Sequence, residues 1–350
     1  YPLRRQRQMC IRDSPLPLEG SPSSTAGAAF SARGGAETAS TVKYRRLCER
    51  VAIEPEPLLL RTLSEPSAHD GAYSTADAQQ PMGEEAVAAI VASVDAFVGV
   101  RKLRLVNLKR PPGVPLLSRD AVEVLARCVK VAPSLTLLDL SHNALDDPTA
   151  AQAIMHMLHG NTRLRSLILR HNQLGQHAAK AAFNELMGDE SRSHKLRELD
   201  LSCNPPLAKW RGQATALNKL LRSNTSVLCL GVSIGGGGVF APPQTSAVSR
   251  TGGLQVRPVL RGRDAAPVEP ARVPPVLTLL STLCRQPERL RAVRLVGEAL
   301  PSEAVLRLCD LLRGSNTLTE LDVSHGYVRD EGAMLIGKAL QENQILVRLG

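Results

Sequence analysis

The chain has 350 residues, a formal net charge of +10 and an aromatic content of only 3%. This length suits two ordinary domains, or a single domain if the chain is built from repeats. Its apolar runs fall short of the roughly 20 residues of a membrane-spanning helix, and its start lacks a signal-peptide pattern, so we expect no membrane partner.

The N-terminal segment is excluded from the fold. Residues 4–13, RRQRQMCIRD, match the translation of a transposase-type sequencing adapter, so residues 1–14 are expected to be an artefact. Their four Arg and one Asp leave about +7 of the formal charge of +10 for the native part. Ser, Ala, Gly and Pro dominate residues 15–40, which is the composition of a disordered leader.

Residues 41–99 predict a helical cap for the repeats that follow. Open repeat arrays need an atypical end, because their first unit would otherwise expose an apolar flank to water. Helical spacing is seen at Tyr44, Leu47, Cys48 and Val51.

From residue 100 onward, one frame of apolar residues recurs. After a starting apolar residue, further apolar residues stand at plus three and plus five, Asn at plus eight and Leu at plus ten, as in Leu135, Leu138, Leu140, Asn143 and Leu145. The starts are residues 100, 135, 164, 196, 227, 290, 318 and 346. We expect the plus-eight residues Asn143, Asn172 and Asn204 to turn inward and bond free backbone groups where the strand bends.

The second half of each unit has helical spacing, as between residues 148 and 159, so a short strand alternates with a helix. No unit can bury its apolar face alone, and the units must therefore stack. The sequence predicts an α/β solenoid with parallel strands on the concave face and helices on the convex face. The repeats span residues 100–234 and 274–350, and the last one stops inside its frame, so we expect the array to continue.

The frame resembles the leucine-rich repeat, L-x-x-L-x-L-x-x-N-x-L, in its ribonuclease-inhibitor-like variety, which implies a horseshoe. The segment ahead of the repeats resembles that of centrosome- and cilium-associated leucine-rich-repeat proteins. The matching residues are Tyr44, Leu47, Cys48, Glu54, Pro55 and Leu63. This second resemblance implies a cytoplasmic protein of the cytoskeleton, at a centrosome or cilium.

A low-complexity insertion, residues 235–273, accounts for the one long interval between repeat starts. It follows a strand directly, where a loop can lengthen without disturbing the stack. Its charged residues are Arg250, Arg257, Arg261, Arg263, Arg272, Asp264 and Glu269. The insertion is either a disordered solvated loop or a basic docking tail for an acidic partner.

Positions plus two, four and six are expected to face the concave surface. They hold Lys102, Arg104, Asp139, Arg170, Glu198, Asp200, Arg294, Glu320 and Asp322, with Ser141, Ser202 and Ser324 at plus six. The charges alternate in sign along the stack. A mixed-charge face suits a protein partner better than a nucleic acid, which favours a continuous basic stripe.

Position plus seven carries His142, His171, Cys203 and His325. Neighbouring strands lie about 4.8 Å apart, so these side chains could converge on zinc. However, no fourth ligand is evident, and equivalent sites in repeats often carry similar residues for structural reasons. We therefore assign neither a metal nor a cofactor.

No motif of an enzyme is present. The GGGG stretch at 235–238 lacks the Lys-Ser/Thr of a phosphate loop, and G-x-S-x-G and H-E-x-x-H are absent. Seven cysteines without a Cys-x-x-Cys pair favour core-filling thiols over disulfides.

The favoured function is a non-catalytic scaffold that binds a protein across its concave face. The alternatives are a GTPase-activating protein of the Ran-regulator type, whose usual acidic tail is not seen, and the sensor region of a nucleotide-binding receptor.

Overall fold

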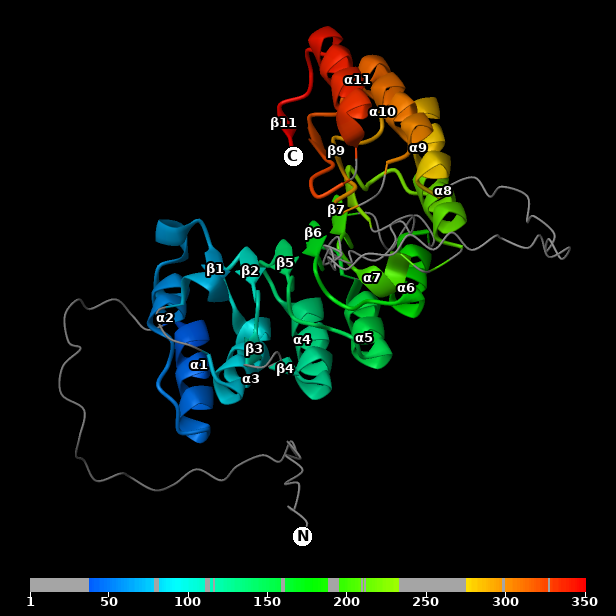
Figure 1. Cartoon of the computed structure of the whole chain (residues 1–350). Coiled ribbons are helices and arrows are strands. Elements are labelled where there is room, and N and C mark those ends of the chain that lie inside the picture. Colours follow the sequence, from blue (N-terminus) through cyan, green and yellow to red (C-terminus); the bar gives the residue numbers. More distant parts are fainter. Residues whose placement is uncertain are drawn as a thin grey trace, which may run out of the picture. The chain divides into compact units, whose positions relative to one another are not determined.

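Short strands and helices alternate along the chain and build a nine-stranded sheet with helices beside it, while two further short strands pair separately (Figure 1). The computed structural model describes residues 38–78, 82–110, 114–115, 117–158, 161–187, 195–208, 210, 212–232, 275–297, 300–326 and 328–350. All of them belong to one unit, residues 37–350. The expected adapter segment, nearly all of the expected leader and the expected insertion lie outside the described residues.

The strands are β1 (Ala72–Ser74), β2 (Lys102–Arg104), β3 (Lys109–Arg110), β4 (Val114–Pro115), β5 (Leu137–Asp139), β6 (Ser166–Ile168), β7 (Glu198–Asp200), β8 (Cys229–Gly231), β9 (Ala292–Arg294), β10 (Glu320–Asp322) and β11 (Arg348–Leu349). The α-helices are α1 (Ala39–Arg50), α2 (Pro57–Ser64), α3 (Glu84–Ser93), α4 (Arg119–Val131), α5 (Pro148–Leu158), α6 (Gln176–Met187), α7 (Pro205–Ala208), α8 (Gln213–Ser223), α9 (Pro275–Arg285), α10 (Ser302–Gly314) and α11 (Arg329–Glu342). Four of these helices, α2, α5, α7 and α9, begin with proline, which suits the first helical position because its missing N–H has no partner there.

Nine of the described strands form one parallel sheet in the order β1-β2-β5-β6-β7-β8-β9-β10-β11. Leu138 pairs with Leu103 on one side and with Leu167 on the other, so residues at plus three pair with each other. The same register holds at Leu230 with Val293 and at Leu321 with Leu349. The predicted repeat starts and the α/β solenoid are therefore confirmed.

The core lies between the sheet and the helices. At plus three and plus five, Leu138, Leu140, Leu167 and Leu169 are completely buried. The main helices of successive repeats pack against each other in the order α3, α4, α5, α6, α8, α9, α10 and α11, and they follow one side of the row of strands (Figure 1). The other face of the sheet is left for polar side chains.

Asn143, Asn172 and Asn204 form a buried ladder after the strands. Asn172 Nδ2 donates to the carbonyls of Leu140 (2.9 Å) and Leu169 (3.1 Å), and its Oδ1 accepts from the backbone N–H of Asn143 (3.0 Å). Asn204 and Asn143 make the equivalent bonds. Each amide thereby ties one repeat to its neighbour.

A second set of asparagines, which the sequence analysis did not identify, lies three residues before the repeat starts. Asn224 follows α8. Its Nδ2 donates to the carbonyl of Leu186 (2.8 Å) at the end of α6, the helix of the previous repeat, while its Oδ1 accepts from the N–H of Val227 (3.0 Å). Asn161 and Asn343 are placed in the same way. These residues fasten the turn from helix to strand.

The expected helical cap contains α1, α2 and α3, but it also supplies strand β1, which extends the sheet by one strand. Helix α1 begins at Ala39, inside the expected leader, with Thr38 as its N-cap. Tyr44, Cys48 and Leu63 are completely buried. Three of the six residues that carry the resemblance of this segment, which we call the cap motif, therefore pack in the core of the cap.

Buried polar groups also join the elements of the cap. The Tyr44 hydroxyl accepts from the N–H of Glu56 (3.1 Å), and the Glu56 carboxylate caps α2 at the N–H of Leu59. Burial raises the pKa of the Tyr44 hydroxyl above its ordinary value, so this group stays neutral. The cap is therefore fixed by hydrogen bonds as well as by apolar packing.

Strands β8 and β9 are adjacent and in register, with Cys229 opposite Ala292 and Gly231 opposite Arg294. The long interval in the sequence falls between these two strands. The sheet continues across it without a change of register.

Candidate functional site

The polar face of the sheet is concave around β6 to β10. These strands are separated by four steps of about 4.8 Å, which on a flat sheet exceeds the combined reach of an arginine and an aspartate. Yet Nη2 of Arg170, just beyond β6, lies 4.0 Å from Oδ2 of Asp322 in β10. The sheet must bend toward this face to bring the two side chains together.

Arg294 of β9 is the centre of a charged network on this face. Its Nη1 donates to Glu198 Oε1 (2.7 Å) and to Asp200 Oδ2 (3.0 Å) in β7. Its Nε donates to Glu320 Oε1 (2.9 Å) in β10. Burial alone would lower the pKa of the Arg294 guanidinium, but the hydrogen bonds to Glu198 and Glu320 raise it above its ordinary value. Arg294 is therefore a fixed cation that ties three strands together.

Gly231 allows this network to cross strand β8, which lies between β7 and β9. It occupies the same position in β8 as Asp200 in β7 and Arg294 in β9. A Cβ atom at Gly231 would lie 2.1 Å from Oδ1 of Asp200. The missing side chain therefore leaves the space through which the Asp200 carboxylate reaches Arg294.

The aspartates at plus four also close the end of their own strands. Oδ1 of Asp200 accepts from the N–H (3.0 Å) and the hydroxyl (2.6 Å) of Ser202. Asp139 with Ser141, and Asp322 with Ser324, repeat this arrangement. Burial opposes ionisation of Asp322, but the bonds from Ser324 lower the pKa of its carboxyl below the ordinary value. One oxygen of each carboxylate thus has a structural role and the other faces the concave surface.

A cavity of ≈ 530 Å³ lies over this part of the sheet. Its charged lining residues are Asp139, Glu198, Asp200, Glu320, Asp322, Arg170, Arg294 and Arg348. Five carboxylates therefore face three guanidinium groups. Polar residues from five strands, β5, β7, β9, β10 and β11, and from the turns after β5 and β6 line this cavity, which suits the polar contacts of a protein interface.

Arg170 is held less tightly than Arg294. Its Nε lies 3.7 Å from Asp200 Oδ2, which is longer than a hydrogen bond, and this buried nitrogen has no hydrogen-bond partner. The side chain is 29% exposed. Its Nη2 lies 4.0 Å from Asp322 Oδ2, so both ion pairs of Arg170 are longer than hydrogen bonds and its partly exposed guanidinium is loosely held.

The other expected concave residues are not part of the network. Lys102 pairs with Asp70 (2.6 Å), which precedes β1, and Arg104 is exposed at the same end of the sheet. Asp139 lines the cavity through its place in β5. Gly231 and Arg348 were not among the expected concave residues, although Arg348 stands at plus two of the last repeat, while His142 and His171, considered above as zinc ligands, line the cavity.

The plus-seven residues share a backbone conformation. His142, His171, Cys203 and His325 all have a φ between 51° and 63°, and Gly297 has a φ of 76° at the same position. The rings of His142 and His171 stack with their centroids 4.2 Å apart. Among the described residues, no group of three or more His, Cys, Asp or Glu is placed to hold a metal ion. The turn geometry explains why this position is equivalent in successive repeats.

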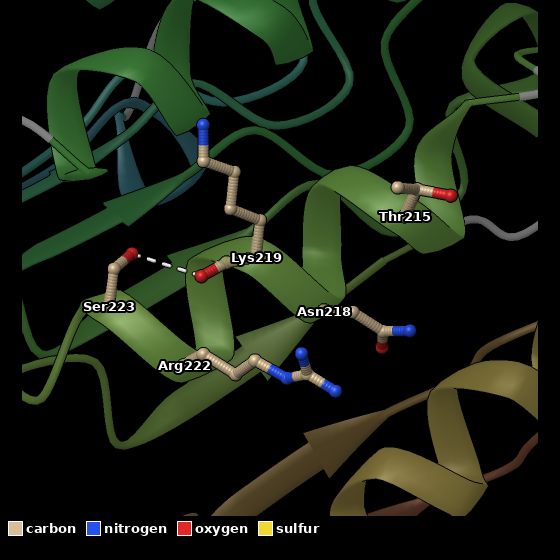
Figure 2. A pocket seen from close by; sticks show the side chains of 5 residues that line it. All are labelled: Thr215, Asn218, Lys219, Arg222 and Ser223. Atoms are coloured by element: carbon tan, nitrogen blue, oxygen red, sulfur yellow. Dashed lines mark hydrogen bonds between the residues drawn. The ribbon is translucent and has the colours of Figure 1, made fainter.

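A second cavity, of ≈ 420 Å³, lies on helix α8 (Figure 2). It is lined by Thr215, Asn218, Lys219, Arg222 and Ser223, and Ser223 Oγ donates to the carbonyl of Lys219 (2.9 Å). Its described lining comes from a single helix. The concave cavity, which combines many strands, is the better candidate for recognition.

Two further expectations concern the cysteines and the membrane. The six cysteines in the described residues are free, and Cys48 and Cys309 are buried. None of the described helices has the length and apolar character to cross a bilayer.

The comparisons with known proteins concern the repeats. The family model described as "Leucine Rich repeat" matches residues 131–150, 192–207 and 314–337. A search of curated proteins finds no match.

Two solved structures are similar to this chain. One is "Leiomodin-1 Actin-Binding Site 2 (ABS2)", with 20% identity, coverage of 43% of this chain and 80% of that chain, and a TM-score of 0.36. The other is the tropomodulin C-terminal domain of Caenorhabditis elegans, with 14% identity, coverage of 44% and 84%, and a TM-score of 0.35.

The matched segments contain β5, β7 and β10, which are central strands of the repeating register. The frame of leucines and the parallel register agree with an α/β repeat solenoid, and three segments of the chain match the leucine-rich-repeat model.

Proposed function

We propose that this chain is a non-catalytic scaffold that binds another protein through the cavity on its concave face. The observation that supports the proposal most directly is the cavity itself, which is polar, open to solvent and lined from several strands. Arg170 adds a partly exposed guanidinium that makes only long ion pairs, and the excess of carboxylates adds acceptors. Such groups suit the polar contacts of a protein interface.

Quantitative affinity capture with the full chain tests the proposal. Arg170→Ala removes the loosely held guanidinium, and Arg127→Ala removes an exposed arginine from α4 as a matched control. We expect the same partner with the wild type and with Arg127→Ala, and a loss of at least tenfold with Arg170→Ala. Equal capture by all three proteins would contradict a role for the cavity.

The cytoskeletal part of the proposal rests on the resemblance of the cap motif, with a centrosome or cilium as the expected site. A fluorescent fusion should coincide with a centrosomal marker in cultured cells. A diffuse signal in cells that contain centrosomes and cilia would contradict this location.

The two other functions predict different results. A Ran-regulator-type activator would accelerate GTP hydrolysis by a small GTPase on the order of a thousandfold. A receptor sensor region would follow a nucleotide-binding domain with a Walker A motif in the full-length transcript. Either observation would replace the scaffold proposal.

A further inference from the structure

A row of exposed arginines follows the edge of the sheet at which the strands begin. Arg101, Arg165, Arg197 and Arg291 each stand one residue before a paired strand residue, at position plus one of their repeats. All four are exposed. We name this set the arginine row. None of the four lines the concave cavity.

The backbone of the arginine row is held by hydrogen bonds from repeat to repeat. The N–H of Arg197 donates to the carbonyl of Arg165 (2.7 Å), and the chain of bonds continues through Leu228 to Arg291. On the other side, Arg165 is joined to Arg101 through Thr136. Five strand steps of about 4.8 Å separate the first arginine from the last, so the row extends over roughly 24 Å. Its backbone is therefore a preorganised support.

The arginine row has no ion-pair partner within the described part of the fold. None of the four guanidinium groups takes part in an ion pair there, because the nearby carboxylates are engaged elsewhere. Glu198 and Glu320 bind Arg294, and Asp70 binds Lys102. Arg165 and Arg197 stand on adjacent strands, where like charges repel. An anionic partner would relieve this repulsion.

An acidic protein segment fits the row better than a nucleic acid. Proteins that bind single-stranded nucleic acid combine basic residues with exposed aromatic rings on which the bases stack. In the described residues, the tyrosines and phenylalanines are buried. A carboxylate needs only the paired N–H groups of a guanidinium, which bind it in a bidentate way.

We propose that the arginine row is a docking strip for an extended, Asp- and Glu-rich segment of a partner protein. At about 3.3 Å per residue, a segment of roughly seven residues covers the strip. Because the strip and the concave cavity share no residue, this inference goes beyond the proposed function, and each can fail without the other.

Fluorescence anisotropy with a labelled, alternating Asp/Glu octapeptide and the full chain tests the strip. We expect binding at an ionic strength of about 50 mM that weakens at about 150 mM, since exposed charges are screened by salt. Arg165→Glu with Arg197→Glu should weaken binding at least tenfold. Arg46→Glu with Arg127→Glu makes the same change in net charge on exposed helical positions of α1 and α4 and should leave the affinity within about twofold.

Three outcomes would overturn the proposal. The wild type fails to bind the peptide at low salt, both double variants lose affinity equally, or an unlabelled octanucleotide binds more tightly than the peptide and displaces it. Circular dichroism and the melting temperature establish that each variant is folded. Arg165→Lys with Arg197→Lys provides a second check, because it keeps the charge and should weaken binding only a few-fold through the loss of bidentate contacts.

Discussion

At the scale of single residues, the turn after each strand determines which side chains it accepts. Position plus seven requires a left-handed backbone, which His142 and Cys203 adopt although most residues avoid it. In three successive repeats position plus eight carries asparagine, whose amide donates to two carbonyls and accepts from backbone N–H, as Asn172 does. Both positions belong to the same turn.

Asn172→Ala should therefore be strongly destabilising. It removes the partner of two carbonyls and leaves the backbone N–H of Asn143 and Leu145 without their acceptor. We expect a loss of about 3 kcal/mol in the free energy of unfolding, because buried groups without a partner cost about 1–3 kcal/mol each after relaxation. Urea titration measures the loss. Asn184→Ala, at an exposed position of α6, should change stability by less than about 0.5 kcal/mol, and a similar effect of both changes would contradict the ladder.

His171 should titrate below its ordinary range. Burial, and then the neighbouring His142 and Arg170, lower the pKa of the His171 imidazole. Because the folded-state pKa lies below the unfolded value, His171 contributes stability that is present above about pH 6.5 and is lost as the pH falls from there through the lower folded-state pKa. NMR titration should show this pKa rising in His142→Asn, which keeps a residue suited to the left-handed turn. An unchanged pKa would mean that the stack has no part in the shift.

At the scale of elements, the charged network around Arg294 depends on strand β8, because Gly231 leaves the space over which the Asp200 carboxylate reaches Arg294. Gly231→Ala places a Cβ against the Asp200 carboxylate, and we expect a loss of about 1–3 kcal/mol from overpacking. Gly337 in α11 is the matched control, because a Cβ there meets nothing within 4 Å. Gly337→Ala should stabilise the protein by about 0.5–1 kcal/mol. Thermal unfolding that shows equal shifts for the two variants would contradict the role of Gly231.

Arg294→Met tests whether the network supports the fold. The change leaves the carboxylates of Glu198, Asp200 and Glu320 close together without their cation. Removing one partner of a buried ion pair costs about 3–5 kcal/mol. Adding Glu320→Gln to Arg294→Met should recover part of the loss, because it removes one of the repelling charges.

The exposed pair of Arg307 and Asp310 on α10 gives the comparison for this experiment. Arg307→Met should cost less than about 1 kcal/mol, since exposed ion pairs contribute little. If Arg294→Met is no more destabilising than Arg307→Met, the network serves recognition alone.

At the scale of the whole molecule, the sequence predicts the parts that repeat. A shift of one residue would turn the leucines of a strand toward solvent, so the leucine frame fixes the register of β2 and β5 to β11. Strand β1 escaped prediction because Ala72, Tyr73 and Ser74 have no leucine frame around them. The asparagines before the repeat starts leave a visible signal in N-T-R-L at 161–164 and N-T-S-V at 224–227.

The charged site was only partly predictable. The alternation of strand residues indicates which side chains leave the core, and it places Arg294 and Glu198 on one face. It does not indicate which of them bind, because the two residues are 96 positions apart and meet across strand β8, which the sequence does not place between them. Gly231 gives no signal at all, since its contribution is the absence of a side chain.

The longest interval between repeat starts, from residue 227 to residue 290, does not interrupt the stack of strands and helices. The backbone of β8 pairs with β9 as closely as other neighbours do, and α8 packs on α9. Connections from strand to helix in other repeats have six to eight residues, as in 323–328 and 140–147. A connection of that length therefore suffices between Val232 and Pro275.

Replacing residues 233–274 by about seven Gly and Ser residues should thus preserve the fold. We expect the stability to rise by roughly 1.5 kcal/mol, because each halving of a flexible loop recovers about 0.6 kcal/mol of closure entropy. Circular dichroism and urea titration measure the outcome, and a scrambled insertion of the original length and composition is the control. If the shortened and the scrambled chains are both less stable than the wild type, the native segment contributes contacts to the stack and is more than a tolerated connection.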